Sequence, residues 1–113
     1  MIILTIKKKW FDLIKSGEKK EEYREIKPYY DSRLPKEFGM FREDNKLVIG
    51  NTWGYLTAYL LKRQIIFKNG YKHDSPSINA ICSLDIGTGK EEWGAEPGKI
   101  YYVLKIHKIV EGK

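Results

Sequence analysis

The sequence predicts an α+β domain built around a small β-barrel with flanking helices. Three observations lead to this prediction. Residues 78–86 and 100–110 alternate in side-chain direction yet are apolar on both faces, a pattern typical of strands that are covered on both sides. Residues 2–6 show the same period of two, and residues 10–14 place apolar side chains at helical spacing. The chain has 113 residues, enough for one core, so we expect a single domain over 1–113.

The first part of the chain is predicted to alternate strands with short helices. After the first strand comes a helix that Ser16 and Gly17 end, because glycine best tolerates the left-handed terminating conformation. A second strand follows over 20–26, where side chains alternate again. Pro28 then favours a short second helix over 28–34.

The middle of the chain combines turn residues with short apolar segments. Glycine and a polar run indicate a loop, and an asparagine–glycine pair indicates a tight turn. The predicted elements are a loop at 36–46, a short strand at 47–49, a helix from Asn51 or Thr52 to about Lys62, a strand at 64–68 and a turn at Asn69 and Gly70. The two long strands come next, joined by a glycine-rich link.

Charge and composition limit the classes of partner. The formal net charge is +6, and each half of the chain contributes +3, so no basic tail stands apart from the fold. A positive surface favours a polyanion as partner, since binding releases counterions from phosphates. Moderately basic surfaces are also common in proteins that bind no nucleic acid.

The cysteine and histidine content argues against a metal or cofactor site. Cys82 has no second cysteine with which to form a disulfide and is predicted to be an inert buried thiol, which fits a reducing compartment. His73 and His107 lack further ligands at metal spacing; His107 would matter only if the fold placed it beside Lys19 or Glu22. No stretch resembles a signal peptide or a membrane-spanning helix, so we expect a cytoplasmic protein with no membrane contact.

The segment SGEKKEEYRE, residues 16–25, concentrates charge directly after the first helix. Glu22 and Arg24 stand two apart on one face of a strand, with Lys19 in the turn before them. If the sheet curls, the three groups come within contact distance, and Glu22 and Arg24 can pair. A partly desolvated Lys19 near an arginine would approach a pKa useful for a general base. The alternative is a solvated edge strand whose charges prevent aggregation, and spacing alone favours it.

The longer segment LTIKKKWFDLIKSGEKKEEYREI resembles the signature of the ASCH family, whose fold is similar to that of PUA RNA-binding domains. The family's motif is Gly-x-Lys-x-x-Glu-x-Arg, matched here by Gly17, Lys19, Glu22 and Arg24. The segments IIFKNGY, CSLDIGTGKEEWGAEPG and YYVLKIHKIV are similar to the later part of such domains. The resemblance implies a PUA-like β-barrel with two or three flanking helices; residues 39–62 are its least familiar portion.

The resemblance also implies a function, namely binding of RNA, a nucleotide or a nucleoside in a cleft between the barrel and the first helix. Trp93, in the loop GKEEWGAEPG, is predicted either to stack on a base beside that cleft or to plug one barrel end as core. The binding residues implied by the family are Lys19, Glu22 and Arg24 in the cleft, with Lys8, Lys9 and Lys20 near its mouth.

Two further functions stay open. Some family members are hydrolases, which would make Lys19 and Glu22 proton-transfer groups acting on RNA or a modified nucleoside, in a ribonuclease or an amidohydrolase. In the members that deacetylate N4-acetylcytidine, a threonine nucleophile falls where this chain has Glu22. A carboxylate is a poor substitute for an alkoxide in acyl transfer, so that mechanism does not carry over unchanged. The third possibility is a vestigial cleft in a protein-interaction scaffold.

Overall fold

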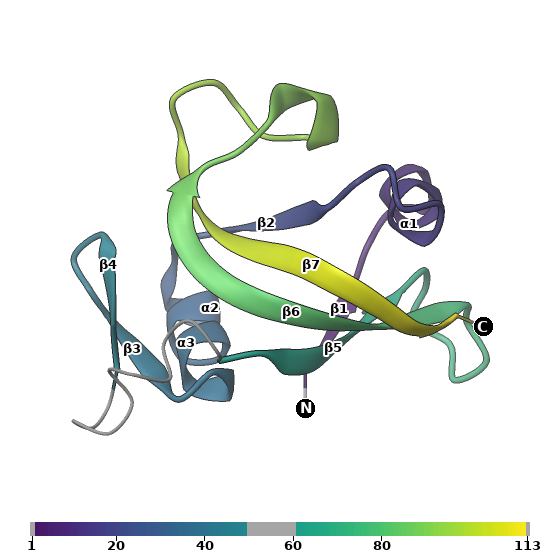
Figure 1. Cartoon of the computed structure of the whole chain (residues 1–113), viewed down its shortest axis with the longest axis horizontal. Coiled ribbons are helices and arrows are strands. Elements are labelled where there is room, and N and C mark those ends of the chain that lie inside the picture. The colour runs from purple at the N-terminus through teal and green to yellow at the C-terminus, as the bar shows by residue number, and fades with distance from the viewer. Residues whose placement is uncertain (1, 50–60, 113) are drawn as a thin grey trace.

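A curled five-stranded sheet forms the body of the molecule, seen in a computed structural model that describes residues 2–49 and 61–112 (Figure 1). The strand order is β1-β5-β6-β7-β2. β1 runs parallel to β5, and the other neighbouring strands are antiparallel. The strands are β1 (Ile2–Thr5), β5 (Arg63–Lys68), β6 (Ser77–Thr88), β7 (Ile100–Gly112) and β2 (Glu21–Glu25). The α+β class is confirmed, and the curled sheet has the form of a half-barrel.

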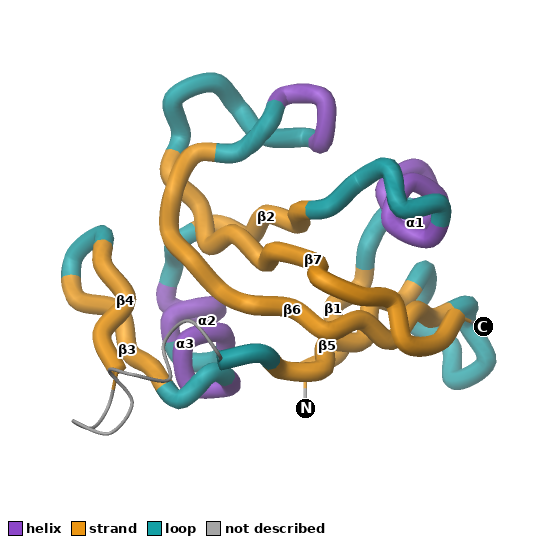
Figure 2. The backbone as a smooth tube through the Cα atoms, viewed as in Figure 1, coloured by secondary structure: helices purple, strands orange, loops and turns teal. Residues whose placement is uncertain are grey.

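Short helices and a separate hairpin flank the two ends of this sheet. Figure 2 shows α1 near one end and α2, α3 and the β3–β4 hairpin near the other. These elements are α1 (Lys8–Lys15), α2 (Pro28–Asp31), α3 (Leu34–Glu37), β3 (Met40–Glu43), β4 (Lys46–Ile49) and the 3₁₀ helix η2 (Glu91–Trp93). Within the described residues, no helix is long and apolar enough to cross a membrane.

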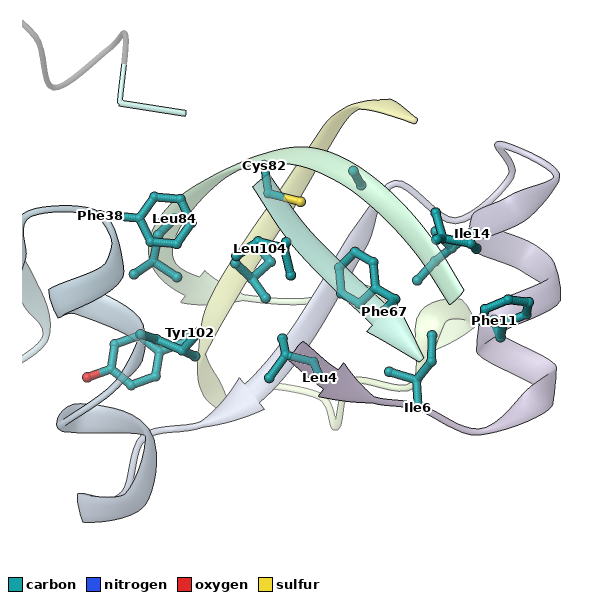
Figure 3. Close-up of a cluster of buried hydrophobic side chains, with 14 residues drawn as sticks. Leu4, Ile6, Phe11, Ile14, Phe38, Phe67, Cys82, Leu84, Tyr102 and Leu104 are labelled. Atoms are coloured by element: carbon teal, nitrogen blue, oxygen red, sulfur yellow. The ribbon is translucent and has the colours of Figure 1, made fainter. Parts of the chain in front are cut away.

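Both faces of β7 are buried over residues 101–104, whereas most of the strand after them is exposed or half-buried. Tyr102 and Leu104 lie in the main core, which also receives side chains from β1, α1, β5 and β6 (Figure 3). Tyr101 and Val103 point the other way and pack with Ala95 in a smaller cluster. Burying each large apolar side chain contributes about 1.5–3 kcal/mol, so the two clusters hold β7 in place from both faces.

Cys82 lies on the core side of β6, facing the same cluster (Figure 3). It is fully buried, and this burial raises the pKa of its thiol to about 12. A thiol that does not ionise is unreactive, so the prediction of an inert buried cysteine is confirmed.

The predicted loop over residues 36–46 is wrong. The segment contains the end of α3, the strand β3 and a two-residue turn at Asp44 and Asn45. Asp44 takes a positive φ of 53°, which Asp and Asn tolerate and which a tight hairpin turn requires. The polar residues around this turn concealed a hairpin whose strands are only four residues each.

Two helix predictions need separate comment. The helix predicted over 28–34 is divided, because α2 ends at Asp31 and α3 begins at Leu34 with Pro35 in its first turn. The helix predicted from Asn51 or Thr52 to about Lys62 falls almost wholly outside the described residues.

An ion pair fastens the β3–β4 hairpin to α2. Arg42 donates through Nε and Nη2 to the two oxygens of Asp31, at 2.9 Å each. Tyr102 of β7 donates its hydroxyl to the same carboxylate at 2.5 Å. Because parallel guanidinium–carboxylate bonds are directional, this cluster sets the position of the hairpin relative to the sheet.

Candidate functional site

The end of α1 determines where Lys19 lies. Gly17 takes a φ of 85°, and its N–H bonds to the carbonyl of Ile14 at 3.0 Å. The N–H of Lys19 then bonds back to the carbonyl of Leu13 at 2.9 Å. The chain therefore reverses under the helix, which directs Lys19 inward, and the prediction that Gly17 ends the helix is confirmed.

The Lys19 ammonium is buried and surrounded by partners. Its side chain is 1% exposed; Nζ donates to Glu22 Oε1 at 2.8 Å and to the carbonyl of Trp93 at 2.9 Å. It also lies 4.2 Å from the centre of the Trp10 ring, within range of a cation–π contact. Burial lowers the pKa of Lys19, and the Glu22 carboxylate opposes that effect. Without these partners a buried charge of this kind would not be tolerated.

Glu22 connects Lys19 to Arg24. The second oxygen of Glu22 accepts from Arg24 Nη2 at 2.8 Å, so this carboxylate, 6% exposed, lies between two cations. Arg24 Nη2 also donates to the carbonyl of Thr5 at 3.0 Å, and its Nη1 donates to the hydroxyl of Tyr30 at 3.1 Å. Thr5 belongs to β1 and Arg24 to β2, the two edge strands, so the network closes the open side of the half-barrel.

One donor in this network has no acceptor. Arg24 Nε is buried, and it has no hydrogen-bond partner among the described residues. Leaving a buried donor unpaired costs about 1–3 kcal/mol, and native structures leave few such groups. An acceptor supplied by a bound molecule or by water would recover that free energy.

The network lines a cavity of about 330 Å³, called here the motif cavity. Lys27 and Lys99 bring positive charge to its lining, and Glu25 and Glu96 bring negative charge. Aromatic side chains supply much of the remaining wall, and they are Trp10, Tyr23, Tyr30, Trp93 and Tyr101. The volume falls within the range of small-molecule sites, and charged groups line this cavity together with the aromatic rings.

The loop between β6 and β7 forms one wall and packs closely against α1. Gly94 lies in this loop with a φ of 99°, and a side chain added there would come within 2.9 Å of the Trp10 ring. The loop is bonded to Tyr101, whose hydroxyl accepts from the N–H of Glu96 at 3.0 Å. Together with the Lys19 bond to the Trp93 carbonyl, these contacts hold Trp93 at the cavity.

The structure brings four of the seven predicted site residues to the motif cavity. They are Lys19, Glu22, Arg24 and Trp93. Lys9 lies next to its wall, with Nζ 4.6 Å from the centre of the Trp10 ring. Lys8 is exposed and pairs with Asp12 at 2.7 Å. Lys20 lines a different cavity, between α1 and β7.

Sequence reasoning missed most of the aromatic wall. Trp10, which its helical spacing directs toward the core, packs partly against the core and also lines the cavity. Tyr101 reaches the cavity because β2 pairs with β7, which sets Tyr101 opposite Glu25. The alternation in β7 does separate Tyr101 from Tyr102, but local sequence does not reveal which strand pairs with which.

Metal-ligating side chains do not gather in the part of the chain that the structure describes. No group of three or more His, Cys, Asp or Glu side chains suited to a metal ion occurs within residues 2–49 and 61–112. The interior polar groups are already ordered by one another, so a ligand would meet fixed charges and rings, and little reorganisation would oppose binding.

Comparisons of the chain with protein-family models, curated proteins and solved structures find no match. Function is therefore inferred from the chemistry of the motif cavity together with the sequence motif whose residues line it.

Proposed function

We propose that the chain is an RNA- or nucleotide-binding domain of the ASCH type, with a PUA-like barrel, and that the motif cavity holds a nucleobase. The observation that carries this proposal is the common location of two features. The ion network of Lys19, Glu22 and Arg24 and the five aromatic side chains line the same cavity of about 330 Å³. Aromatic faces stack on any nucleobase, and fixed polar groups orient it.

Arg24 is the residue that we expect to contact the ligand most directly. Its Nε donor lacks an acceptor within residues 2–49 and 61–112, and a base carbonyl or a phosphate oxygen would supply one. Lys27 and Lys99 add cations that would neutralise phosphate groups. Trp93, half-buried at the cavity, offers a ring on which a base can stack.

A binding titration tests the proposal. Intrinsic tryptophan fluorescence would be followed as single-stranded RNA, structured RNA and free nucleotides are added, at low and at high salt. We expect binding that weakens with salt and that Arg24→Ala reduces. Lys46→Ala is the matched control, because it removes one positive charge from the β3–β4 hairpin and leaves the cavity intact. No binding of any of the three ligands in low salt overturns the proposal.

A hydrolase is the second candidate, favoured by one observation. Lys19 has a pKa lowered by burial and contacts Glu22 at 2.8 Å within a cavity that can hold a nucleoside. A neutral amine in that position would act as a general base toward water or a ribose hydroxyl. Incubation with RNA and with acylated cytidines should give product with the wild type and none with Lys19→Met. Equal product from both proteins would exclude this role.

A further inference from the structure

A second cavity, of about 390 Å³, is lined by residues at the end of α1 and by residues of the strand β7. It is called here the helix-end cavity. Ile14 and Gly17 line it from the α1 side, and residues 106–109 line it from β7. It shares Lys19 with the motif cavity and no other lining residue. The two cavities are therefore neighbours that meet at a single side chain.

The lining of the helix-end cavity is apolar and cationic. Ile14, Ile106 and Ile109 provide the apolar part, whereas Lys20 and Lys108 provide ammonium groups. Neither ammonium group has a hydrogen-bond or ion-pair partner within the part of the chain that the structure describes, and no carboxylate lines the cavity. Unpaired cations beside apolar surface are complementary to an anion that carries apolar atoms.

Positive charge extends beyond this lining. His107 also lines the cavity, with Nε2 2.7 Å from the hydroxyl of Ser83. Burial lowers the pKa of His107, and the cations of Lys62 and Lys105 lower it further. Lys105 is itself paired with Asp85 at 3.4 Å. His107 thus lines the same cavity as Lys19, in a region where the charges of Lys62 and Lys105 make the potential positive.

The negative end of the α1 dipole does not cancel this potential. Three carbonyls of the last turn, those of Asp12, Leu13 and Ile14, accept hydrogen bonds from the N–H groups of Ser16, Lys19 and Gly17. These carbonyls are satisfied within the turn, which reduces the partial negative charge that they present to the cavity.

We propose that the helix-end cavity binds the sugar–phosphate backbone of an RNA strand whose neighbouring base occupies the motif cavity. This inference rests on the proposed function. Lys20 and Lys108 contact the phosphates, and the isoleucine side chains pack against the sugars. The strand passes over the exposed turn between α1 and β2, so that one molecule fills both cavities. Glu18, an exposed acid on this turn, opposes the strand.

The test compares ligands of two lengths. Affinities would be measured for the four 5′-mononucleotides and for mixed-sequence single-stranded RNA hexamers, across a range of salt concentrations. The variant is Lys20→Ala with Lys108→Ala. The control is Lys36→Ala with Lys46→Ala, which removes the same charge from α3 and β4. We expect the variant to bind hexamers on the order of tenfold more weakly in low salt, with a salt slope reduced by about 1.4, two phosphates at about 0.7 each.

The outcomes separate the inference from the proposed function. Three outcomes overturn the backbone site and leave the motif cavity as the binding site. They are unchanged hexamer binding by the variant, an equal loss of hexamer binding in the control, and an equal loss of mononucleotide binding by the variant. Failure of the wild type to bind either ligand overturns the backbone site, and it overturns the proposed function as well when structured RNA also fails to bind. Glu18→Gln provides an independent check, because removing the opposing acid should strengthen hexamer binding and leave mononucleotide binding unchanged; weaker or equal hexamer binding contradicts the path over the turn.

Discussion

Arg24 and Arg42 both bind carboxylates, but they use their guanidinium groups differently. Every nitrogen of Arg42 has an acceptor, since Nε and Nη2 donate to Asp31 and Nη1 donates to the carbonyl of Asp44. Among the residues that the structure describes, Arg24 finds acceptors for Nη1 and Nη2, and its buried Nε has none. The protein supplies an acceptor for every nitrogen of Arg42, whereas Nε of Arg24 has none among the described residues.

This difference separates a structural cluster from a candidate site. The paired bonds from Arg42 hold the pKa of Asp31 below its ordinary value and fix the hairpin to α2. Around Arg24, the carboxylate of Glu22 is shared with a buried lysine, and the whole group lines a cavity. An arginine in a salt bridge is therefore not enough to identify a binding site. The buried donors that have no hydrogen-bond partner in the protein are more informative.

The largest effect is expected from removing the shared carboxylate. Glu22→Ala leaves the buried Lys19 and the partly buried Arg24 without a counter-charge, which should lower the free energy of unfolding by about 3–5 kcal/mol. Asp31→Ala should cost less, because its cluster is more exposed to water. Urea unfolding of both variants measures the difference. Equal losses would mean that the two clusters are alike in their contribution to stability.

Exchanging each arginine for lysine tests whether Arg24 Nε contributes to ligand binding. Arg24→Lys keeps the charge but removes Nε, so ligand affinity should fall by about 1.5–3 kcal/mol, the value of a hydrogen bond to a charged group. Arg42→Lys should leave affinity unchanged and loosen the hairpin. Titrations with RNA or nucleotide, together with thermal unfolding, check both expectations. Equal affinity losses would indicate that neither arginine contacts the ligand.

Raising the pH should affect the two clusters in opposite directions. The folded-state pKa of Lys19 is lowered from 10.5, so the unfolded chain binds more protons and stability rises as the pH rises toward that value. Burial and the bond to Asp31 raise the pKa of Tyr102 from 10.0 to about 12, so its contribution is lost between those values. Urea unfolding from neutral pH to pH 10 should show a rising wild-type stability relative to Lys19→Met. A constant difference would contradict the sign derived for Lys19.

The smallest effect is expected at Lys8, which the resemblance to the ASCH family implies to lie near the cleft mouth. It is exposed and forms a pair with Asp12 one helical turn away. Such pairs contribute about 0.3–0.5 kcal/mol, so Lys8→Ala should reduce stability by no more than that and leave ligand affinity within twofold. Thermal unfolding and titration would detect a larger change, which would place Lys8 in the ligand contact.

The part of the site that is encoded locally was predictable. Gly17 ends α1, and the spacing of Lys19, Glu22 and Arg24 across a turn and a strand brings the three charges together. Spacing alone favours a solvated edge strand. In the structure the three charges form a buried network instead, with Lys19 1% exposed, because the sheet curls around them.

The rest of the cavity depends on long-range pairing. Tyr101 and Trp93 lie more than seventy residues after Lys19 in the chain, and they reach it only because β2 pairs with β7 and the intervening loop folds back over α1. No local pattern specifies that pairing. The hairpin of β3 and β4 was not predicted for a different reason. Its turn at Asp44 and Asn45 lacks the glycine that marks most tight turns.

The bond from Arg24 to the Thr5 carbonyl acts as a cross-brace, because β1 and β2 stand at opposite ends of the strand order. A bound molecule that drew the Arg24 guanidinium toward itself would break the hydrogen bond to the Thr5 carbonyl. Amide protons of β1 would then exchange with solvent faster in the complex than in the free protein, so that occupancy of the cavity could be followed from the far edge of the sheet.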